Sequence, residues 1–234
     1  MPDVPADDLR AFVRLIDAIR PWLGQLVIVG GWSHRLHRLH EMAHVPSYAP
    51  LLTVDADVAI SRTEPLEGSV RAALLSAGFD EQLVGVHTPP IAEYRLGDAK
   101  GDFYAEFLAP LTGSGTKRSG ATDATVVSGG VTAQKVRYLE VLVMQPWTVR
   151  IDAALGFPVS RPTDIRVPNA VSFIAQKLLI RAARPPKKRA QDVLYIHDTL
   201  ELFGANLEEL RVLWRDALRP AIPPKTSARI EIIA

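Results

Sequence analysis

The sequence predicts an α/β protein, more strictly α+β, in which a mixed sheet is followed by a small all-helical C-terminal domain. A β-branched run, Leu26–Val29, stops at Gly30-Gly31 and leads into a helical pattern over Trp32–Ala43. Further short β-branched runs alternate with turn residues as far as Val167, and beyond Pro168 the periodicity is helical throughout. We therefore expect two domains, residues 1–167 and 168–234.

The other elements follow from periodicity and turn signals. Two helices are expected in the first part of the chain, an amphipathic one over Asp7–Leu23 and one over Leu66–Ala77 that ends at Gly78. Expected strands are Leu51–Ile60, Glu81–Val86, a hairpin of Ala92–Leu96 with Phe103–Leu108, Thr125–Val127 within a mobile loop (Thr112–Gly130), Thr148–Ala153 and Asp164–Val167. Ala133–Met144 fits either a helix or a strand. The C-terminal helices are expected over Asn169–Ala183, Ala190–Leu202 and Leu207–Leu218, with a basic loop over residues 184–189.

Composition excludes several classes of protein. The chain has 234 residues, 47% of them apolar, with 15 Gly, 18 Pro and no Cys, which argues against a disordered, collagenous or disulfide-stapled protein. The 27 Lys and Arg nearly balance the 26 Asp and Glu, so any nucleic-acid contact must be a local patch. The acidic N-terminus is unlike a secretory signal, and no apolar run approaches the roughly 20 residues that span a bilayer. We expect a soluble cytoplasmic protein with no membrane partner.

Two carboxylates stand in one apolar segment. Asp55 and Asp57 are two residues apart in an expected strand, so both side chains project from the same face. Like charges in an apolar segment persist most easily when a cation holds them, and oxygen ligands favour Mg²⁺ or Mn²⁺. The alternative is a strand end with two solvated turn residues.

The glycine turn suits a phosphate. A strand that ends in Gly30-Gly31 and enters a helix presents backbone N–H groups at the positive end of the helix dipole, and the Ser33 hydroxyl adds a donor. A plain tight turn explains the glycines equally well without a ligand.

Together these motifs resemble the DNA polymerase β superfamily of nucleotidyltransferases. Gly30-Gly31-Trp32-Ser33 followed by Thr53-Val54-Asp55-Ala56-Asp57 is similar to its GG-x-S/T and T-x-D-x-D signature. Tyr104–Leu111 resembles the strand that carries the family's third carboxylate, here Glu106 where Asp is more usual. The resemblance implies a nucleotidyltransferase domain in which Asp55, Asp57 and Glu106 hold Mg²⁺ or Mn²⁺, while Gly30, Gly31 and Ser33 hold the phosphates of an NTP.

The tail resembles AbiEii-type and related uncharacterised prokaryotic nucleotidyltransferases. Val167–Leu179 is similar to their Lys-containing helix, and the later basic stretch is followed by Asp192. The resemblance implies that Lys177 contacts the triphosphate, that Asp192 orients the site, and that an NMP passes to an acceptor hydroxyl with release of pyrophosphate. It further implies an RNA or tRNA acceptor, a toxin or defence role, and a cognate antitoxin as a partner. The alternatives are a small-molecule acceptor of the aminoglycoside kind, a protein hydroxyl as the acceptor, and a catalytically silent nucleotide- or RNA-binding relative.

Cations cluster at the start of the tail. Six fall within thirteen residues without an acid: Lys177, Arg181, Arg184, Lys187, Lys188 and Arg189. The first three are spaced i, i+4, i+7 on one expected helix face, which suits phosphates or is simply a solvated face. A weaker basic set surrounds the mobile loop, at Lys117, Arg118, Lys135 and Arg137.

Four histidines follow the glycine turn. Three of them, His37, His40 and His44, share an expected helix face, and with His34 they offer imidazole ligands for zinc. The spacing identifies no partner ligand, so surface histidines near the substrate phosphates are the favoured interpretation, with Trp32 as a packing residue.

Overall fold

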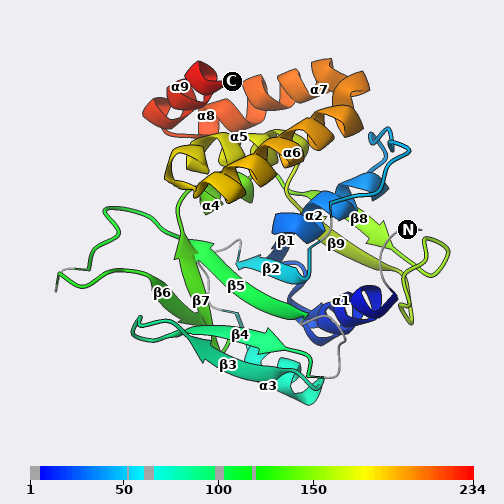
Figure 1. Ribbon diagram of the computed structural model, residues 1–234, viewed down its shortest axis with the longest axis vertical. Helices are drawn as coiled ribbons and strands as arrows, with labels where there is room; N and C mark the ends of the chain where they lie inside the picture. Colours follow the sequence, from blue (N-terminus) through cyan, green and yellow to red (C-terminus); the bar gives the residue numbers. More distant parts are fainter. Residues whose placement is uncertain (1–5, 52, 61–65, 98–102, 118–119) are drawn as a thin grey trace.

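The fold is seen in a computed structural model that describes residues 6–51, 53–60, 66–97, 103–117 and 120–234 (Figure 1). Strands β1 to β7 form one mixed sheet in the order β1-β2-β5-β4-β3, with β7 pairing the end of β5 and β6 pairing β7. These strands are β1 (Leu26–Val29), β2 (Asp55–Ile60), β3 (Asp80–Val84), β4 (Ile91–Arg95), β5 (Tyr104–Pro110), β6 (Thr125–Ser128) and β7 (Val131–Val136). A separate antiparallel pair consists of β8 (Trp147–Ile151) and β9 (Thr163–Val167). The predicted mixed sheet and helical C-terminal region are confirmed.

Helices cover both faces of the larger sheet. The first face packs against α1 (Ala6–Ala18) and α3 (Val70–Ser76), and the second against α4 (Leu139–Leu142), α5 (Ala170–Ile180) and α6 (Pro186–Phe203). The remaining helices are α2 (Gly30–Leu36), α7 (Leu207–Val212), a π-helical turn (Leu213–Leu218), α8 (Arg219–Ala221) and α9 (Pro224–Ile233). In Figure 1, α7 to α9 lie beyond α5 and α6 on the side away from the sheet.

Strand alternation sorts the side chains between the two faces. Leu26, Ile28, Val58 and Phe107 point to the α1 face and belong to the main hydrophobic cluster. Val27, Val29, Ala59 and Leu108 point to the other face, where they pack with Phe173 and Tyr195 of α5 and α6. This second cluster crosses the predicted domain boundary at 167/168, and the boundary itself remains a prediction.

Register aligns acidic side chains on the second face. Parallel pairing of β2 with β5 sets Asp57 beside Glu106, and antiparallel pairing of β5 with β4 sets Glu106 beside Glu93. The hairpin expected from the sequence is therefore present. This register places the Asp57, Glu106 and Glu93 carboxylates in one row across the sheet. Asp55 lies two residues before Asp57 and therefore on the same face.

Several expected boundaries are wrong. The strand predicted over Leu51–Ile60 begins only at Asp55, and the Leu51 carbonyl instead accepts a hydrogen bond from Arg35 Nε (3.2 Å). The helix predicted from Trp32 already begins at Gly30 and gives way to a 3₁₀ turn at His37. Residues 187–189 belong to the first turn of α6 and not to a loop, since Pro186 sits at its N1 position. The ambiguous 133–144 segment contains both alternatives, the end of β7 and then α4, and α9 was not predicted.

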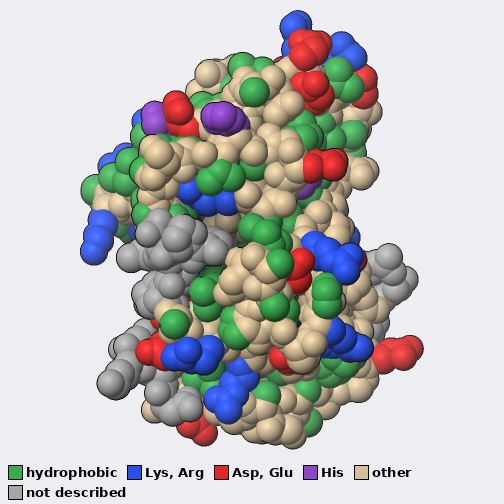
Figure 2. Space-filling view, turned by 90° about the vertical axis from the view of Figure 1, so that its right-hand side faces the viewer, with side chains coloured by type: hydrophobic (Ala, Val, Ile, Leu, Met, Phe, Trp, Pro, Cys, Tyr) green, Lys and Arg blue, Asp and Glu red, His purple; other side chains and the backbone are tan. Residues whose placement is uncertain are grey.

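Charges are mixed on the surface that Figure 2 displays. On that face basic and acidic side chains lie among one another, as the net charge of +1 suggests. Within the ranges given above, no helix combines the length and the apolar character needed to cross a membrane.

Candidate active site

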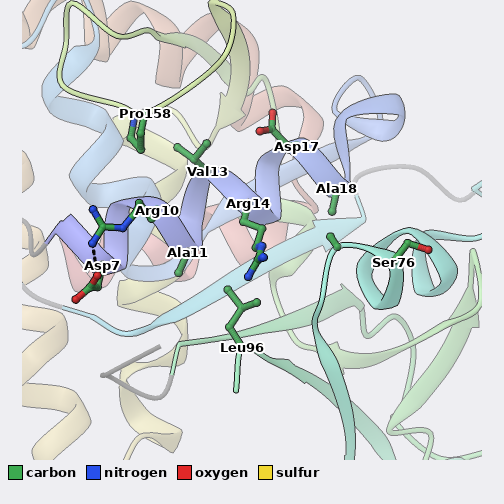
Figure 3. Close-up of a pocket in the computed structure, with 11 residues that line it drawn as sticks. Asp7, Arg10, Ala11, Val13, Arg14, Asp17, Ala18, Ser76, Leu96 and Pro158 are labelled. Carbon is green, nitrogen blue, oxygen red and sulfur yellow. Dashed lines mark hydrogen bonds and ion pairs between the residues drawn. The ribbon is translucent and has the colours of Figure 1, made fainter. Parts of the chain in front are cut away.

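A cavity of about 260 Å³ lies between the second face of the sheet and helices α5 and α6. It collects most of the site residues predicted from the sequence: Gly30, Gly31, Asp55, Asp57, Glu106, Lys177, Arg184, Lys188 and Asp192. A larger hollow of about 860 Å³ lies along α1, where Asp7 pairs with Arg10 (Figure 3). None of the predicted residues lines that hollow, so the smaller cavity is the candidate active site.

The carboxylates are close enough to disturb one another. Burial, followed by the charge of Asp55, raises the pKa of Asp57 to about 6, although Lys177, Arg184 and Lys188 oppose the rise. Burial, together with the charges of Asp57 and Glu93, raises the pKa of Glu106 to about 7. Glu93 is itself tied to Arg95, whose Nη2 lies 2.6 Å from its carboxylate. The row therefore holds more negative charge than a folded interior readily accepts.

Both glycines are required by the neighbouring side chains. A Cβ at Gly30, whose φ is +64°, would lie 2.0 Å from Asp57 Oδ2. A Cβ at Gly31 would meet the Thr53 side chain at 2.4 Å and the Tyr195 hydroxyl at 2.9 Å. The turn thus lets the backbone at the start of α2 approach the carboxylates, which a side chain at either position would prevent.

Opposite the carboxylates lies a buried ion pair. Lys177 Nζ donates to Asp192 Oδ1 at 2.7 Å, and both side chains are almost completely buried. Arg184 Nε lies 3.3 Å from the other oxygen of Asp192. Burial lowers the pKa of Lys177, while the Asp192 carboxylate works against that shift. The pair joins α5 to α6 and fixes the Lys177 ammonium in the wall of the cavity.

Other predicted site residues lie outside the lining. Ser33 is completely buried and its hydroxyl donates to the Gly30 carbonyl (2.8 Å), so it braces the turn and does not face the cavity. The expected stripe of Lys177, Arg181 and Arg184 is broken because α5 ends at Ile180. Arg181, Lys187 and Arg189 are exposed and do not line the cavity.

The second basic set does not face the cavity either. Lys135 pairs with Asp123 at 2.8 Å. Arg137 donates to the carbonyls of Gly113 and Ser114, which holds the start of the 112–130 loop. Lys117 is exposed, and Arg118 falls outside the described residues.

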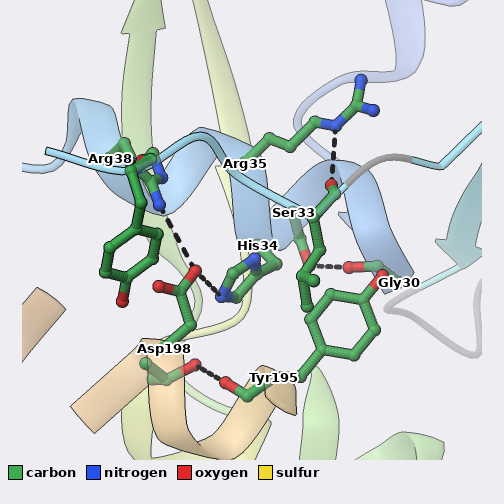
Figure 4. Close-up of polar contacts among 10 residues, drawn as sticks. Gly30, Ser33, His34, Arg35, Arg38, Tyr195 and Asp198 are labelled. Carbon is green, nitrogen blue, oxygen red and sulfur yellow. Dashed lines mark hydrogen bonds and ion pairs between the residues drawn. The ribbon is translucent and has the colours of Figure 1, made fainter. Parts of the chain in front are cut away.

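Two of the four histidines are not surface residues, whereas His40 is half-buried and His44 is exposed as expected. His34 and His37 are completely buried, which corrects the interpretation of these two residues from the sequence. His34 Nε2 lies 3.1 Å from Asp198 Oδ2 on α6 (Figure 4), and His37 Nε2 lies 2.7 Å from the Pro168 carbonyl. His40 stacks on Trp147 at 4.0 Å. These contacts connect α2 to the helical tail, and the expected packing role of Trp32 is confirmed by its 4.0 Å stacking on Phe12.

Sequence reasoning missed several residues that line the cavity, among them Tyr195, Phe173 and Gln176. Tyr195 has its ring 4.7 Å from Lys177 Nζ and 4.9 Å from the His34 ring, so it packs between the ion pair and α2. Phe173 and Gln176 line the cavity from α5. Phe173 and Lys177 are four residues apart and Gln176 lies between them, so helical spacing from Lys177 was the signal that could have found the α5 residues.

The acidic row offers ligands suited to a divalent cation. In the part of the chain that the structure describes, no three His, Cys, Asp or Glu side chains already converge as a metal-binding group. The donors nevertheless fit one chemically, since Asp55, Asp57 and Glu106 all offer carboxylate oxygens to the same cavity. The raised pKa values of Asp57 and Glu106 reflect negative charge that a bound cation would neutralise.

Comparisons with known proteins bear on most of the chain. A family model described as "Nucleotidyltransferase" matches residues 7–219, which takes in the sheet, the cavity and helices α5 to α7. No curated protein matches the sequence.

Proposed function

The chain belongs to this nucleotidyltransferase family, and from that premise we propose that it moves an NMP from an NTP to an acceptor hydroxyl, releasing pyrophosphate. One observation carries the proposal. A single cavity is lined on the sheet side by Asp55, Asp57 and Glu106 and on the helix side by Lys177, Arg184 and Lys188. Such opposed charges suit a reaction in which negative charge accumulates on a transferring phosphate.

Asp55, Asp57 and Glu106 would hold Mg²⁺ or Mn²⁺ in this reaction. A divalent cation bound there supplies charge neutralisation on the phosphates and lowers the pKa of the attacking hydroxyl. The role of the chain is to keep the three carboxylates on adjacent strands, where the register fixes their spacing.

Lys177, Arg184 and Lys188 would bind the triphosphate from the other side. Lys177 is held by Asp192, so little conformational entropy is lost when it meets an anionic substrate. Gly30 and Gly31 line the cavity beside the carboxylates and, having no side chains, would let the phosphates approach the backbone closely.

The acceptor is proposed to be RNA. Lys188 lines the cavity at the start of α6, and its neighbours Lys187 and Arg189 are exposed. Exposed cations beside the cavity favour an acceptor that carries several phosphates. A toxin or defence role with a cognate antitoxin follows from the resemblance alone and remains a prediction.

The proposed reaction is tested by following the transfer of a radioactive label from an NTP to RNA. Purified protein is incubated with each of the four α-³²P-labelled NTPs, Mg²⁺ or Mn²⁺ and total bacterial RNA, and the products are resolved on a gel. We expect label in an RNA band with the wild type, a loss of at least a thousandfold in Asp55→Ala/Asp57→Ala, and full activity in the exposed control Asp216→Ala.

A second readout separates the outcomes. Mg²⁺-dependent NTP binding, measured by titration, is expected to disappear in Asp55→Ala/Asp57→Ala. Binding without transfer to RNA would contradict the RNA acceptor and favour a small-molecule or protein acceptor. Absence of both would contradict the proposed reaction and favour a silent relative.

A further inference from the structure

Gln176 is a buried polar side chain in the cavity wall. It is 6% exposed and lines the cavity from α5. Among the described residues its amide makes no hydrogen bond, unlike Lys177 beside it, which donates to Asp192, and its nitrogen and oxygen are not sealed from solvent. The amide is therefore open to the cavity, and a ligand bound there can form hydrogen bonds with it without displacing a protein partner.

The surroundings of Gln176 differ from those of the carboxylates. The cavity has an apolar wall made of Leu108, Val136, Leu139, Leu142 and Phe173. Leu108 follows Glu106 by two residues on the same face of β5, so this wall begins roughly 7 Å further along the strand. Phe173 lies one helical turn before Gln176 and Lys177. Gln176 is thus placed between the apolar wall and the cationic group.

This placement fits one part of a nucleotide. The triphosphate requires cations, whereas a nucleobase is a flat apolar body with hydrogen-bonding groups on its edge. An amide offers one acceptor and two donors without a net charge, which complements such an edge.

We infer that Gln176 is a specificity-determining residue that reads the edge of the nucleobase of the NTP, held against the apolar wall of the cavity. The inference rests on the proposed function, because it requires that an NTP binds in this cavity. It assigns the choice of base to α5, separate from the carboxylates that would hold the metal.

The experiment measures binding and not turnover. Dissociation constants are determined by titration for the four NTPs and for inorganic tripolyphosphate, which has no base, in the presence of Mg²⁺. We expect the wild type to prefer one base by roughly tenfold, the discrimination that a good amide–base pair supplies. In Gln176→Leu we expect the four constants to converge to within about threefold, with tripolyphosphate binding changed less than twofold.

Two further variants keep the test decisive. Gln176→Glu retains the shape but removes the amide donor, and should change the order of the four affinities relative to tripolyphosphate. Gln191→Leu removes a second cavity amide, one that pairs with Tyr195, and should change all four affinities by the same factor. A purely structural role for Gln176 would likewise change them uniformly.

The outcomes distinguish the inference from the proposed function. Equal affinities for the four NTPs in the wild type, or an unchanged preference in Gln176→Leu, would overturn the inference and leave nucleotidyl transfer intact. Failure of the wild type to bind any NTP would overturn both.

Discussion

The two faces of the sheet are built from the same strands but carry opposite kinds of side chain. On the α1 face, β2 and β5 present Ala56, Val58, Ala105 and Phe107, all of them completely buried. On the α5 face the alternate positions of those strands present Asp55, Asp57 and Glu106, followed by Ala59 and Leu108. The first face stabilises the fold, whereas the second accepts a cost in stability because it brings like charges together.

The largest effect on stability is expected on the apolar face. Phe107→Ala should lower the free energy of unfolding by about 3–5 kcal/mol, because the ring is fully buried and its removal leaves a cavity. Urea denaturation measures the loss. Phe107→Leu is the matched variant with a smaller loss, and a change below about 1 kcal/mol in Phe107→Ala would contradict the assignment of the core to this face.

On the acidic face, by contrast, a substitution is expected to raise the free energy of unfolding. The pKa of Asp57 is raised to about 6, so the folded protein binds this proton more tightly than the unfolded chain does. Stability should therefore fall as the pH rises from about 4 to about 6. At pH 8 in EDTA, Asp57→Asn should be more stable than the wild type by about 2–3 kcal/mol. Urea denaturation checks this, with Asp216→Asn as the exposed control, and a less stable Asp57→Asn would refute the cost assigned to this face.

The smallest change in stability is expected at the contact between α2 and the helical tail. Burial, followed by the neighbouring His34, lowers the pKa of His37 to about 3, so the unfolded chain takes up the proton first as the pH falls. The contribution of His37 is complete above about pH 6.5 and decreases below it, by about 2 kcal/mol between pH 6.5 and pH 5.

Comparing variants isolates the contribution of His37 to the pH dependence of stability. The pH dependence of unfolding should lose that component in His37→Gln, whose amide can still donate to the Pro168 carbonyl. It should persist in His197→Gln, because the His197 side chain is 69% exposed. Equal slopes for wild type and His37→Gln would show that His37 is not buried in the neutral form.

Much of the fold could be predicted because local patterns determine it. The Leu26–Val29 strand and the helical tail come from runs of β-branched residues and from helical periodicity. The start of β2 could not be predicted, because Leu51 and Val54 are apolar and fit a strand pattern. The contact of the Leu51 carbonyl with Arg35 is a tertiary contact that no local pattern indicates. Residues 133–144 were ambiguous because they contain the end of one strand and the start of one helix.

The candidate site was predictable where a motif carried it. Gly30, Gly31, Asp55 and Asp57 belong to one recognisable pattern, and the structure brings them to one cavity with Glu106. The burial of His34 and His37 was not predictable, because their neighbours Asp198 and Phe173 come from helices more than a hundred residues away. Gln176 was missed because an isolated Gln in an apolar helix matches no motif.

The order of synthesis gives the second hydrophobic cluster a further consequence. Val27, Val29 and Leu108 leave the ribosome well before Phe173 and Tyr195, which must cover them. Until α6 has emerged, the nascent chain exposes a sheet face that is apolar at one end and acidic at the other. We expect the charge at the acidic end to keep that uncovered surface hydrated and to oppose association with a second copy of the same intermediate. The same carboxylates that make the finished fold less stable would therefore favour its correct completion.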